Sequence, residues 1–420
     1  MKAPPFWIYI LITVLAVLNV VAAYAADTGG ATERVVEKNR QPGFYTDGFR
    51  ILPEIEASVY YDDNIYATKR ARESDLVSVI SPSVKVNSQW PNHKLDLSGG
   101  ANIGRYLDIS AENYEDLWLD VDGAYDLSDE SQIFAGAGLS RNHESRDSKE
   151  SSEQRIDEPT TYDAQRFQLG FNQMLGLSVL KIGVTHESLD YDNVGTLIND
   201  DRDRTVNGLG VRFSRALSSQ NQLFVQGVAN QRRYDEQRDQ DGFERDSDGH
   251  NVAIGMNQTY TGGHRLEAYL GYLTQDYDDP RFSRVSEADF GFDLRWHPAA
   301  KTKLTAALDR SLNETTEIGS SGYLYTGLDL QVDQKLSTNV LGYLNYNYGL
   351  AEFQDVGRED TTQTINCGIK YFMSPKIMLS GSYSHINNDS NDFSLTSSAT
   401  DTNDYDRNLF FLTLKVRFAR

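Results

Sequence analysis

The chain has 420 residues, a formal net charge of −21 at pH 7 and a mean hydropathy of −0.52. This negative charge argues against a polyanion such as nucleic acid as a partner. After the N-terminal apolar run, no segment approaches the roughly 20 consecutive apolar residues that a membrane helix needs. A transmembrane β-barrel is compatible with this low hydropathy, because its lipid-facing and lumen-facing residues alternate.

Residues 1–25 have the layout of a Sec signal peptide. An apolar run from Phe6 to Val21 follows Lys2, and the small residues of Ala23–Ala25 suit signal peptidase, so cleavage is expected directly after this triplet. The alternative is a retained membrane anchor, which the short run and the lack of a following basic cluster disfavour. Residues 26–48 are polar and of mixed charge, which predicts a short flexible periplasmic segment.

Residues 49–420 alternate between apolar and polar side chains with the period of a β-strand. The clearest case has Leu117 and Leu119 on one face, and Asp116 and Asp120 on the other. A helix would spread these aspartates around its circumference, whereas a strand places them on one side. This part of the chain is therefore expected to be built from strands.

The connections between the predicted strands alternate between short turns and long polar segments. The short turns are expected at residues 90–93, 128–131, 218–221, 261–264, 297–300, 337–339 and 374–376. The long segments are expected at residues 62–74, 144–161, 191–202, 235–249, 276–286 and 388–404. Short periplasmic turns with longer external loops are typical of outer-membrane barrels.

The number of segments predicts an all-β fold, a transmembrane antiparallel up-and-down β-barrel of about 18 strands. A soluble sandwich or propeller would not need such regular long and short connections, and a propeller would repeat every 40–50 residues or so. The last strand alternates up to Phe418, and it resembles the aromatic-ended C-terminal strand read by the barrel-assembly machinery. That machinery is therefore an expected partner.

In a barrel, the polar phase of each strand faces the lumen, because a charge at mid-membrane on the lipid face costs about 2–4 kcal/mol. A barrel of about 18 strands is wide enough for an aqueous channel. The expected pore-lining residues are Glu54, Glu56, Asp116, Trp118, Asp120, Asp122, Asp126, Arg212, Glu267, Asp289, Asp293, Arg295 and Lys303. Their acidic excess predicts a cation-selective channel. A neutral or cationic polymer should pass more readily than a uronic-acid polymer, unless Arg212, Arg295 and Lys303 cluster into a separate path.

Aromatic residues share the polar phase with these charges: Trp118, Phe134, Phe224, Tyr269 and Tyr343. Rings beside carboxylates and amides suit sugars, whose CH-rich faces stack while their hydroxyls form hydrogen bonds. The other interpretation is that the rings fill space or belong to interfacial girdles. Both interpretations remain open at this point.

The sequence predicts no enzyme, and no metal or cofactor site. The seven histidines fall at predicted turns or near loop-side strand ends, and neither Gly-x-Ser-x-Gly nor a phosphate-binding motif occurs. With Glu244 as the first ligand of a calcium loop, the twelfth position is Gly255 instead of glutamate, so the EF-hand pattern fails. Loose calcium bridging from residues 239–249 to lipopolysaccharide stays open. The single cysteine, Cys367, is expected to be a small apolar strand residue.

The segment Glu54–Thr68 contains the core Tyr-Asp-Asp-Asn-Ile-Tyr at Tyr61–Tyr66. This opening resembles that of the β-barrel porin type 2 family, which includes outer-membrane proteins associated with exopolysaccharide and capsule gene clusters. The layout is similar from Gly48 to Phe418. The resemblance implies a barrel that lets a secreted polysaccharide cross the outer membrane, and it implies no catalytic residues.

We therefore expect a Gram-negative outer-membrane channel for exopolysaccharide export or assembly. Its expected partners are outer-membrane lipids and lipopolysaccharide, the exopolysaccharide and a periplasmic export machinery. The alternatives are a general or solute-selective diffusion porin, and a structural or adhesive barrel whose loops bind an external partner. Genes for glycosyltransferases and a polymerase nearby would favour export.

Overall fold

The structure is a computed structural model that describes residues 42–150, 158–391 and 403–419. The expected signal peptide and residues 26–41 of the segment after it lie outside these ranges. No helix among the described residues has the length and apolar character needed to cross a membrane.

The described residues form strands and two short 3-10 helices. The strands are β1 (Phe44–Thr46), β2 (Phe49–Asp62), β3 (Asp75–Ser88), β4 (His93–Tyr106), β5 (Tyr114–Ser128), β6 (Ser131–His143), β7 (Thr161–Leu175), β8 (Ser178–Tyr191), β9 (Arg204–Ala216), β10 (Asn221–Tyr234), β11 (Ser247–Tyr260), β12 (His264–Tyr277), β13 (Val285–Ala299), β14 (Thr302–Asn313), β15 (Tyr323–Lys335), β16 (Val340–Phe353), β17 (Glu359–Ser374), β18 (Ile377–Ser390) and β19 (Tyr405–Arg417). The 3-10 helices are η2 (Ser110–Glu112) and η3 (Asp200–Arg202).

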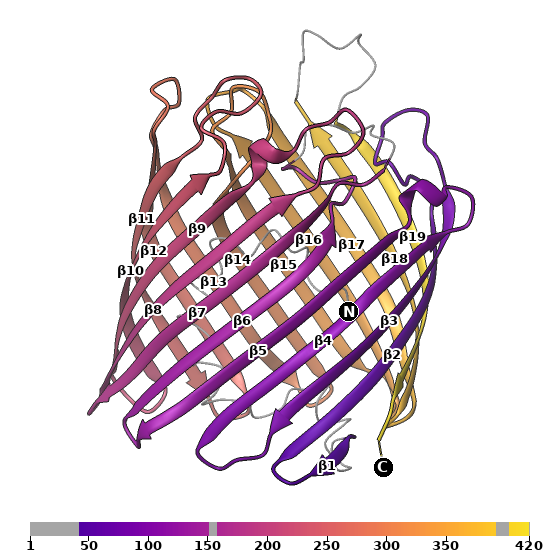
Figure 1. Cartoon of the computed structure of the whole chain (residues 1–420). Coiled ribbons are helices and arrows are strands. Elements are labelled where there is room, and N and C mark those ends of the chain that lie inside the picture. The colour runs from indigo at the N-terminus through magenta and orange to yellow at the C-terminus, as the bar shows by residue number, and fades with distance from the viewer. Residues whose placement is uncertain (1–41, 151–157, 392–402, 420) are drawn as a thin grey trace.

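Strands β2 to β19 form a closed barrel in which each strand pairs antiparallel with its neighbours in sequence (Figure 1). The last strand closes on the first, from Leu409 opposite Asp62 to Arg417 opposite Glu54. Closure leaves none of the described strands β2 to β19 without a neighbour on either side, so these strands can satisfy their backbone hydrogen bonds inside the wall. The prediction of an all-β, antiparallel up-and-down barrel of about 18 strands is confirmed.

The two ends of the barrel differ in the length of their connections (Figure 1). Residues 375–376 join β17 to β18 at one end, whereas residues 235–246 join β10 to β11 at the other. We name these ends the short-turn rim and the long-loop rim, and the outer-membrane pattern places the long-loop rim outside the cell. Strand β1 falls in the segment expected to be flexible, and it pairs with the start of β2 at the short-turn rim.

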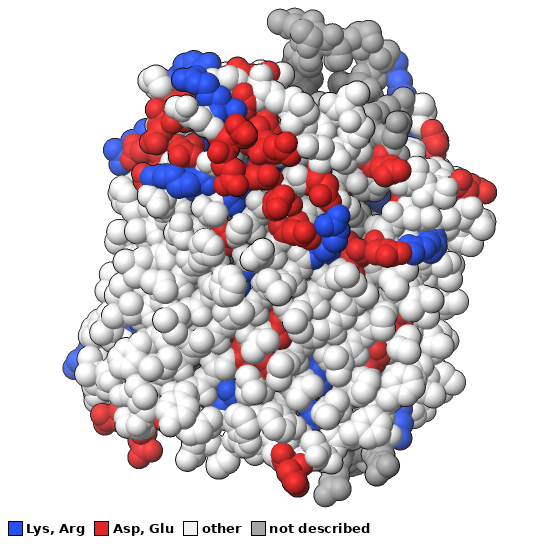
Figure 2. All heavy atoms as spheres, in the orientation of Figure 1, with Lys and Arg blue, Asp and Glu red and all other residues white. Residues whose placement is uncertain are grey.

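Successive side chains point to opposite faces of the wall. On β5, Leu117, Leu119 and Tyr125 are 52%, 50% and 57% exposed, whereas Asp116 and Asp120 on the other face are partly buried. Figure 2 shows charged side chains gathered at the long-loop rim, above a broad belt of mostly uncharged surface. An apolar belt of this kind is the lipid-facing surface of an outer-membrane barrel.

The opening motif at Tyr61–Tyr66 fastens the seam between β2 and β19. Asp62 is fully buried, and both of its carboxylate oxygens accept hydrogen bonds from Arg407 Nε, at 3.0 and 2.9 Å. Asp63 accepts hydrogen bonds from the backbone N–H and the side-chain amide of Asn408, both at 2.6 Å. The motif therefore ties together the two strands that close the barrel.

An epitope tag inserted within residues 235–246 should bind antibody on intact cells, because this connection lies at the long-loop rim. A tag at residues 375–376 should bind only after the outer membrane is permeabilised. Flow cytometry before and after permeabilisation measures both, and the opposite labelling pattern would reverse the orientation.

Leu119→Arg should lower the free energy of unfolding by about 2–4 kcal/mol, because the charge would face lipid near the middle of β5. Asp122→Arg is the matched control on the other face of the same strand, and it should cost much less. Urea titrations in lipid vesicles measure both variants. Equal losses would show that this wall does not face a membrane.

Candidate channel interior and mouth

The inner face of β5 forms an acidic wall whose carboxylates contact neighbouring strands. Asp120 Oδ1 lies 3.6 Å from Nη2 of Arg166 on β7, and Asp122 Oδ1 accepts a hydrogen bond from Gln168 Nε2 at 3.0 Å. The other charged members are Asp116, which lies 2.8 Å from His143 Nδ1, and Asp126, which accepts a hydrogen bond from Gln132 at 2.7 Å. The wall is thus acidic, and each of these carboxylates has a polar or basic partner.

A basic cluster lies on β9, β12, β13 and β14, toward the short-turn rim. Arg212 Nη1 donates to Glu267 Oε1 at 3.0 Å, and Arg265 Nη2 donates to the other oxygen of the same carboxylate at 3.3 Å. The remaining predicted members are Arg295 and Lys303, which interact electrostatically with Asp293, the cross-strand partner of Glu267. The three predicted basic residues therefore share one region of the wall, as a separate basic path requires.

The other predicted pore-lining residues also have partners on the inner face. Glu54 accepts a hydrogen bond from Arg417 Nε at 2.6 Å, and Glu56 lies 2.9 Å from Lys415 Nζ, both at the seam. Asp289 is buried and accepts a hydrogen bond from Asn251. All predicted pore-lining residues thus follow the phase opposite the exposed apolar side chains, and their role in passage stays a prediction.

Aromatic rings lie over glycines of the neighbouring strand on the inner wall. A Cβ added to Gly100 would overlap the indole of Trp118, so only glycine permits this approach. The same arrangement recurs for Phe134 over Gly170, Phe224 over Gly255, Tyr269 over Gly291 and Tyr343 over Gly368. Each ring is therefore held against the wall instead of standing free in the lumen.

Cations already occupy the faces of two of these rings. The Arg212 guanidinium lies 3.4 Å from the ring centroid of Phe224, and Lys370 Nζ lies 4.8 Å from that of Tyr343. Phe134 is itself buried. Of the five predicted rings, Trp118 and Tyr269 therefore remain the candidates for contact with a sugar.

Residues 144–150, which follow β6, fold across the long-loop rim. Lys149 Nζ contacts Asp360 Oδ2 at 3.2 Å and Asn388 Oδ1 at 3.0 Å, on β17 and β18. The next residue, Glu150, accepts a hydrogen bond from Nη2 of Arg204 on β9 at 2.8 Å. Because β9 and β18 are half a circuit apart in the barrel, two consecutive residues connect opposite parts of the wall.

The connection between β14 and β15, residues 314–322, contacts residues 144–150 in the mouth of the barrel, which is the opening at the long-loop rim. The backbone N–H of Thr316 donates to the backbone oxygen of Glu150 at 2.7 Å. On the other side, Arg358 donates to the Glu317 carboxylate. Residues 144–150 and 314–322, which we name the mouth connections, are therefore joined to each other and to the wall.

Five buried or half-buried residues lie beneath these connections, and we name them the Arg–Tyr row: Tyr191, Arg204, Arg232 and Tyr234 on the wall, and Arg202 in η3. The guanidinium of Arg202 lies 4.1 Å from the ring centroid of Tyr191, and that of Arg204 lies 5.6 Å from Tyr191 and 5.8 Å from Tyr234. These distances allow cation–π contacts, which hold the guanidinium groups in place.

Carboxylates from the mouth connections lie on this row. The pairs are Glu144 with Arg202, Glu150 with Arg204 and Tyr191, and Glu314 with Arg232 and Tyr234. Hydrogen bonds between ionised partners are shorter and stronger than neutral ones. The mouth connections are therefore docked by charge on one side of the barrel.

Docking of Glu150 depends on pH in a defined direction. Burial disfavours its charged form, but the guanidinium groups of Arg204 and Arg202 outweigh burial and lower the pKa of Glu150. The docked loop then binds fewer protons than the released loop. Docking is therefore favoured above the ordinary glutamate pKa of about 4.3, and it is lost as the pH falls through the lowered pKa.

The current through the protein in planar bilayers should therefore stay constant from neutral pH to about pH 5, and rise in stronger acid. Glu150→Gln should remove this acid-induced step, because the amide cannot take up the proton. An unchanged step in the variant would assign the titration to another group.

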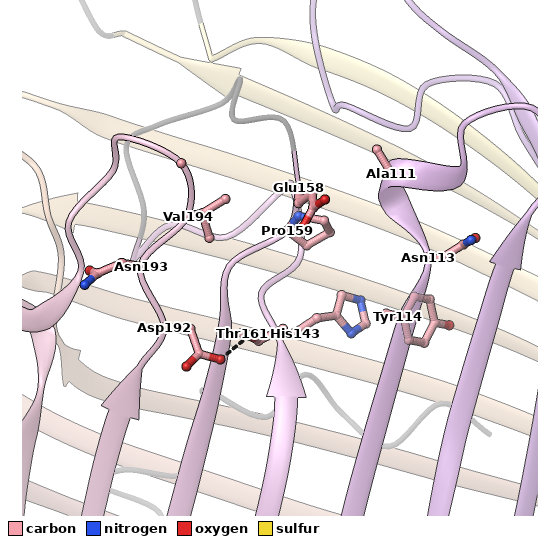
Figure 3. Close-up of a pocket in the computed structure, with 11 residues that line it drawn as sticks. Ala111, Asn113, Tyr114, His143, Glu158, Pro159, Thr161, Asp192, Asn193 and Val194 are labelled. Atoms are coloured by element: carbon pink, nitrogen blue, oxygen red, sulfur yellow. Dashed lines mark hydrogen bonds between the residues drawn. The ribbon is translucent and has the colours of Figure 1, made fainter.

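A separate pocket of about 570 Å³ opens among the connections at the long-loop rim (Figure 3). Its lining includes Tyr114 and His143, which stack with centroids 3.9 Å apart, and Thr161, which donates to Asp192 at 2.5 Å. Among the described residues there is no group of three side chains suited to hold a metal ion. The pocket thus offers polar contacts, but His143 already covers one face of the Tyr114 ring.

The sequence prediction missed the Arg–Tyr row. Arg204 and Arg232 follow the polar phase of β9 and β10, which was the available signal. Their partners Glu150 and Glu314 lie in polar segments that appear solvated when read alone. The docked mouth could not be found without knowing that these connections turn inward.

A family model described as "Putative beta-barrel porin 2" matches residues 40–418 of the chain. Among solved structures, the outer membrane protein OpdK from Pseudomonas aeruginosa is 11% identical, with a TM-score of 0.49, over 90% of this chain and 100% of that chain. The FrpB iron transporter from Neisseria meningitidis is 8% identical, with a TM-score of 0.49, over 87% and 81% of the two chains. These likenesses are too distant to indicate what passes through the barrel. No curated protein matches the chain.

Proposed function

The chain belongs to the Putative beta-barrel porin 2 family and is an outer-membrane β-barrel porin, and from this premise we propose that it exports an exopolysaccharide. Passage is passive, and a periplasmic machinery supplies the direction. The observation that supports this proposal is the placement of Trp118 and Tyr269 over glycines on the inner wall, beside carboxylates and amides.

Rings held in this way suit a sliding sugar chain. Trp118 lies between Asp116 and Asp120 on the inner face of β5, so one residue offers an apolar surface and its neighbours accept hydrogen bonds from hydroxyl groups. A ring already packed against the wall loses little further freedom when a sugar contacts it, which lowers the entropic cost of binding. Weak contacts of this kind let a polymer advance.

Deletion of the gene should leave the polymer in the periplasm while polymerisation continues. Fractionation of medium, periplasm and cytoplasm, with sugar analysis of each, measures this. Complementation with Trp118→Leu should restore less secretion than wild type. Tyr125→Leu is the matched control, because Tyr125 is 57% exposed on the outer face of the same strand, and it should restore secretion fully. Normal surface polysaccharide in the deletion strain would overturn the proposal.

A second candidate is a solute-selective diffusion porin, and the docked mouth connections favour it. Loops that meet in the mouth restrict passage to small solutes, which would explain ion pairs that join opposite parts of the wall. Swelling of protein-containing liposomes in sugars of increasing size tests this candidate. Normal polysaccharide secretion in the deletion strain, together with slower uptake of a small solute, would favour it over export.

A further inference from the structure

The mouth contains two carboxylate clamps built in the same way. Glu150 Oε1 accepts hydrogen bonds from Arg204 Nη2 at 2.8 Å and from the Tyr191 hydroxyl at 2.9 Å. The second clamp holds Glu314 between Arg232 and the Tyr234 hydroxyl, the latter at 2.5 Å. Each clamp thus combines one guanidinium and one phenol from the wall, and the chain's own glutamate fills it.

The glutamates do not saturate these arginines. The Nε atoms of Arg202, Arg204 and Arg232 are buried and have no hydrogen-bond partner among the described residues. A guanidinium has five donors and binds a carboxylate best through two parallel hydrogen bonds. Arg202 binds Glu144 in this way, at 3.0 and 2.8 Å, whereas Arg204 donates one hydrogen bond to Glu150. A carboxylate that is not fixed to a loop backbone could use Nε together with an Nη, which the docked glutamates do not do.

The clamps follow one another along the wall. Arg204 lies between the rings of Tyr191 and Tyr234, so the two clamps share one stack of guanidinium and phenol groups. Strand β9 carries Arg204 at its long-loop end and Arg212, a member of the basic cluster, nearer the short-turn rim. Basic groups therefore lie near both ends of the inner face of β9, four strands away from the acidic wall of β5.

We propose that the Arg–Tyr row is a binding track for a carboxylated polysaccharide, a polymer that contains uronic acids. Glu144, Glu150 and Glu314 occupy this track in place of the polymer's own carboxylates. The proposal rests on the proposed export function, whose cargo it assigns to the acidic class. It replaces the expectation of a neutral or cationic cargo, because the charged groups of the mouth are arginines that face loop carboxylates.

Two double variants remove the same ion pairs from opposite sides. Glu150→Gln with Glu314→Gln takes away the carboxylates of the two clamps, and Arg204→Gln with Arg232→Gln takes away their guanidinium groups. If the clamps only hold the loops in place, both variants behave alike. If the row binds a carboxylated polymer, the first variant frees the binding groups and the second destroys them.

The experiment uses the purified full chain in planar bilayers, with hexagalacturonate as the probe and maltohexaose as the neutral control. Current block is titrated from the long-loop side in calcium-free buffer. Hexagalacturonate should bind the glutamate variant about tenfold or more tightly than wild type, and the arginine variant about tenfold or more weakly. Equal affinities for the two variants, or equal block by maltohexaose, would overturn the proposal.

A milder variant guards against failure of the arginine variant to fold. Tyr191→Phe with Tyr234→Phe keeps both arginines and removes one donor from each clamp, so hexagalacturonate affinity should fall severalfold. Wild-type affinity in this variant would count against the clamps. The export proposal is tested separately: normal secretion in the deletion strain overturns export but leaves the binding track, whereas blocked secretion without hexagalacturonate binding does the reverse.

Discussion

Replacing Arg407 with Met is expected to lower the free energy of unfolding by about 3–5 kcal/mol, because it leaves Asp62 as an unpaired charge inside the protein. Asp62 is fully buried, and Arg407 is its ionic partner across the seam between β2 and β19. A buried carboxylate without its cation must either stay charged in a poor solvent or take up a proton. Both outcomes cost stability at the point where the barrel closes.

Urea titration in lipid vesicles, with heat-modifiable migration in gels as a second readout, measures this loss. Arg72→Met is the matched control, because Arg72 pairs with Asp406 at the same seam but both side chains are well exposed. It should cost less than about 1 kcal/mol. Arg407→Met with Asp62→Asn should recover part of the stability. Similar losses for Arg407→Met and Arg72→Met would show that the buried pair does not hold the seam.

The same contacts explain what the family resemblance can and cannot indicate. The motif at Tyr61–Tyr66 resembles the family opening, and two of its members, Asp62 and Asp63, bind Arg407 and Asn408 of the last strand. The motif is therefore part of barrel closure. Similarity at this motif supports the fold but does not indicate the cargo, which depends on the residues of the lumen and the mouth.

The barrel itself could be predicted because its signal is local. Alternation along β5 separates Leu117 and Leu119 from Asp116 and Asp120 within a single strand. The turns can be recognised from their composition and spacing. Closure then follows from the even number of strands and the need to satisfy every backbone hydrogen bond in a membrane. None of these steps needs knowledge of distant contacts.

The mouth could not be predicted because its contacts are distant in sequence. Glu150 lies 54 residues from Arg204, and Glu314 lies 82 residues from Arg232. A glutamate in a polar connection has the same sequence signature whether it faces water or an inward arginine. The indirect signal was the polar phase of β9 and β10, which places Arg204 and Arg232 on the inner face close to the rim.

Releasing the mouth connections from the β16–β18 side of the wall is expected to increase the current through the open channel severalfold. Lys149→Met removes the contact with Asp360, in which the two side chains are 8% and 1% exposed, and Glu317→Gln removes the contact with Arg358. Buried pairs are little screened by salt, so salt alone should not open the wild type. Single-channel recordings between 0.1 and 1 M KCl compare wild type with the double variant. Over this range the Debye length falls from about 10 Å to about 3 Å.

Lys69→Met is the control for this variant, because Lys69 pairs with Asp404 at the same rim but remains 45% exposed and does not join opposite parts of the wall. Its current should match wild type. In the Lys149→Met, Glu317→Gln variant the Arg–Tyr row is intact, so hexagalacturonate should still block the larger current. A wild-type current in that variant would mean that these pairs do not restrict passage. A larger current that hexagalacturonate no longer blocks would mean that the polymer binds the connections themselves instead of the wall beneath them.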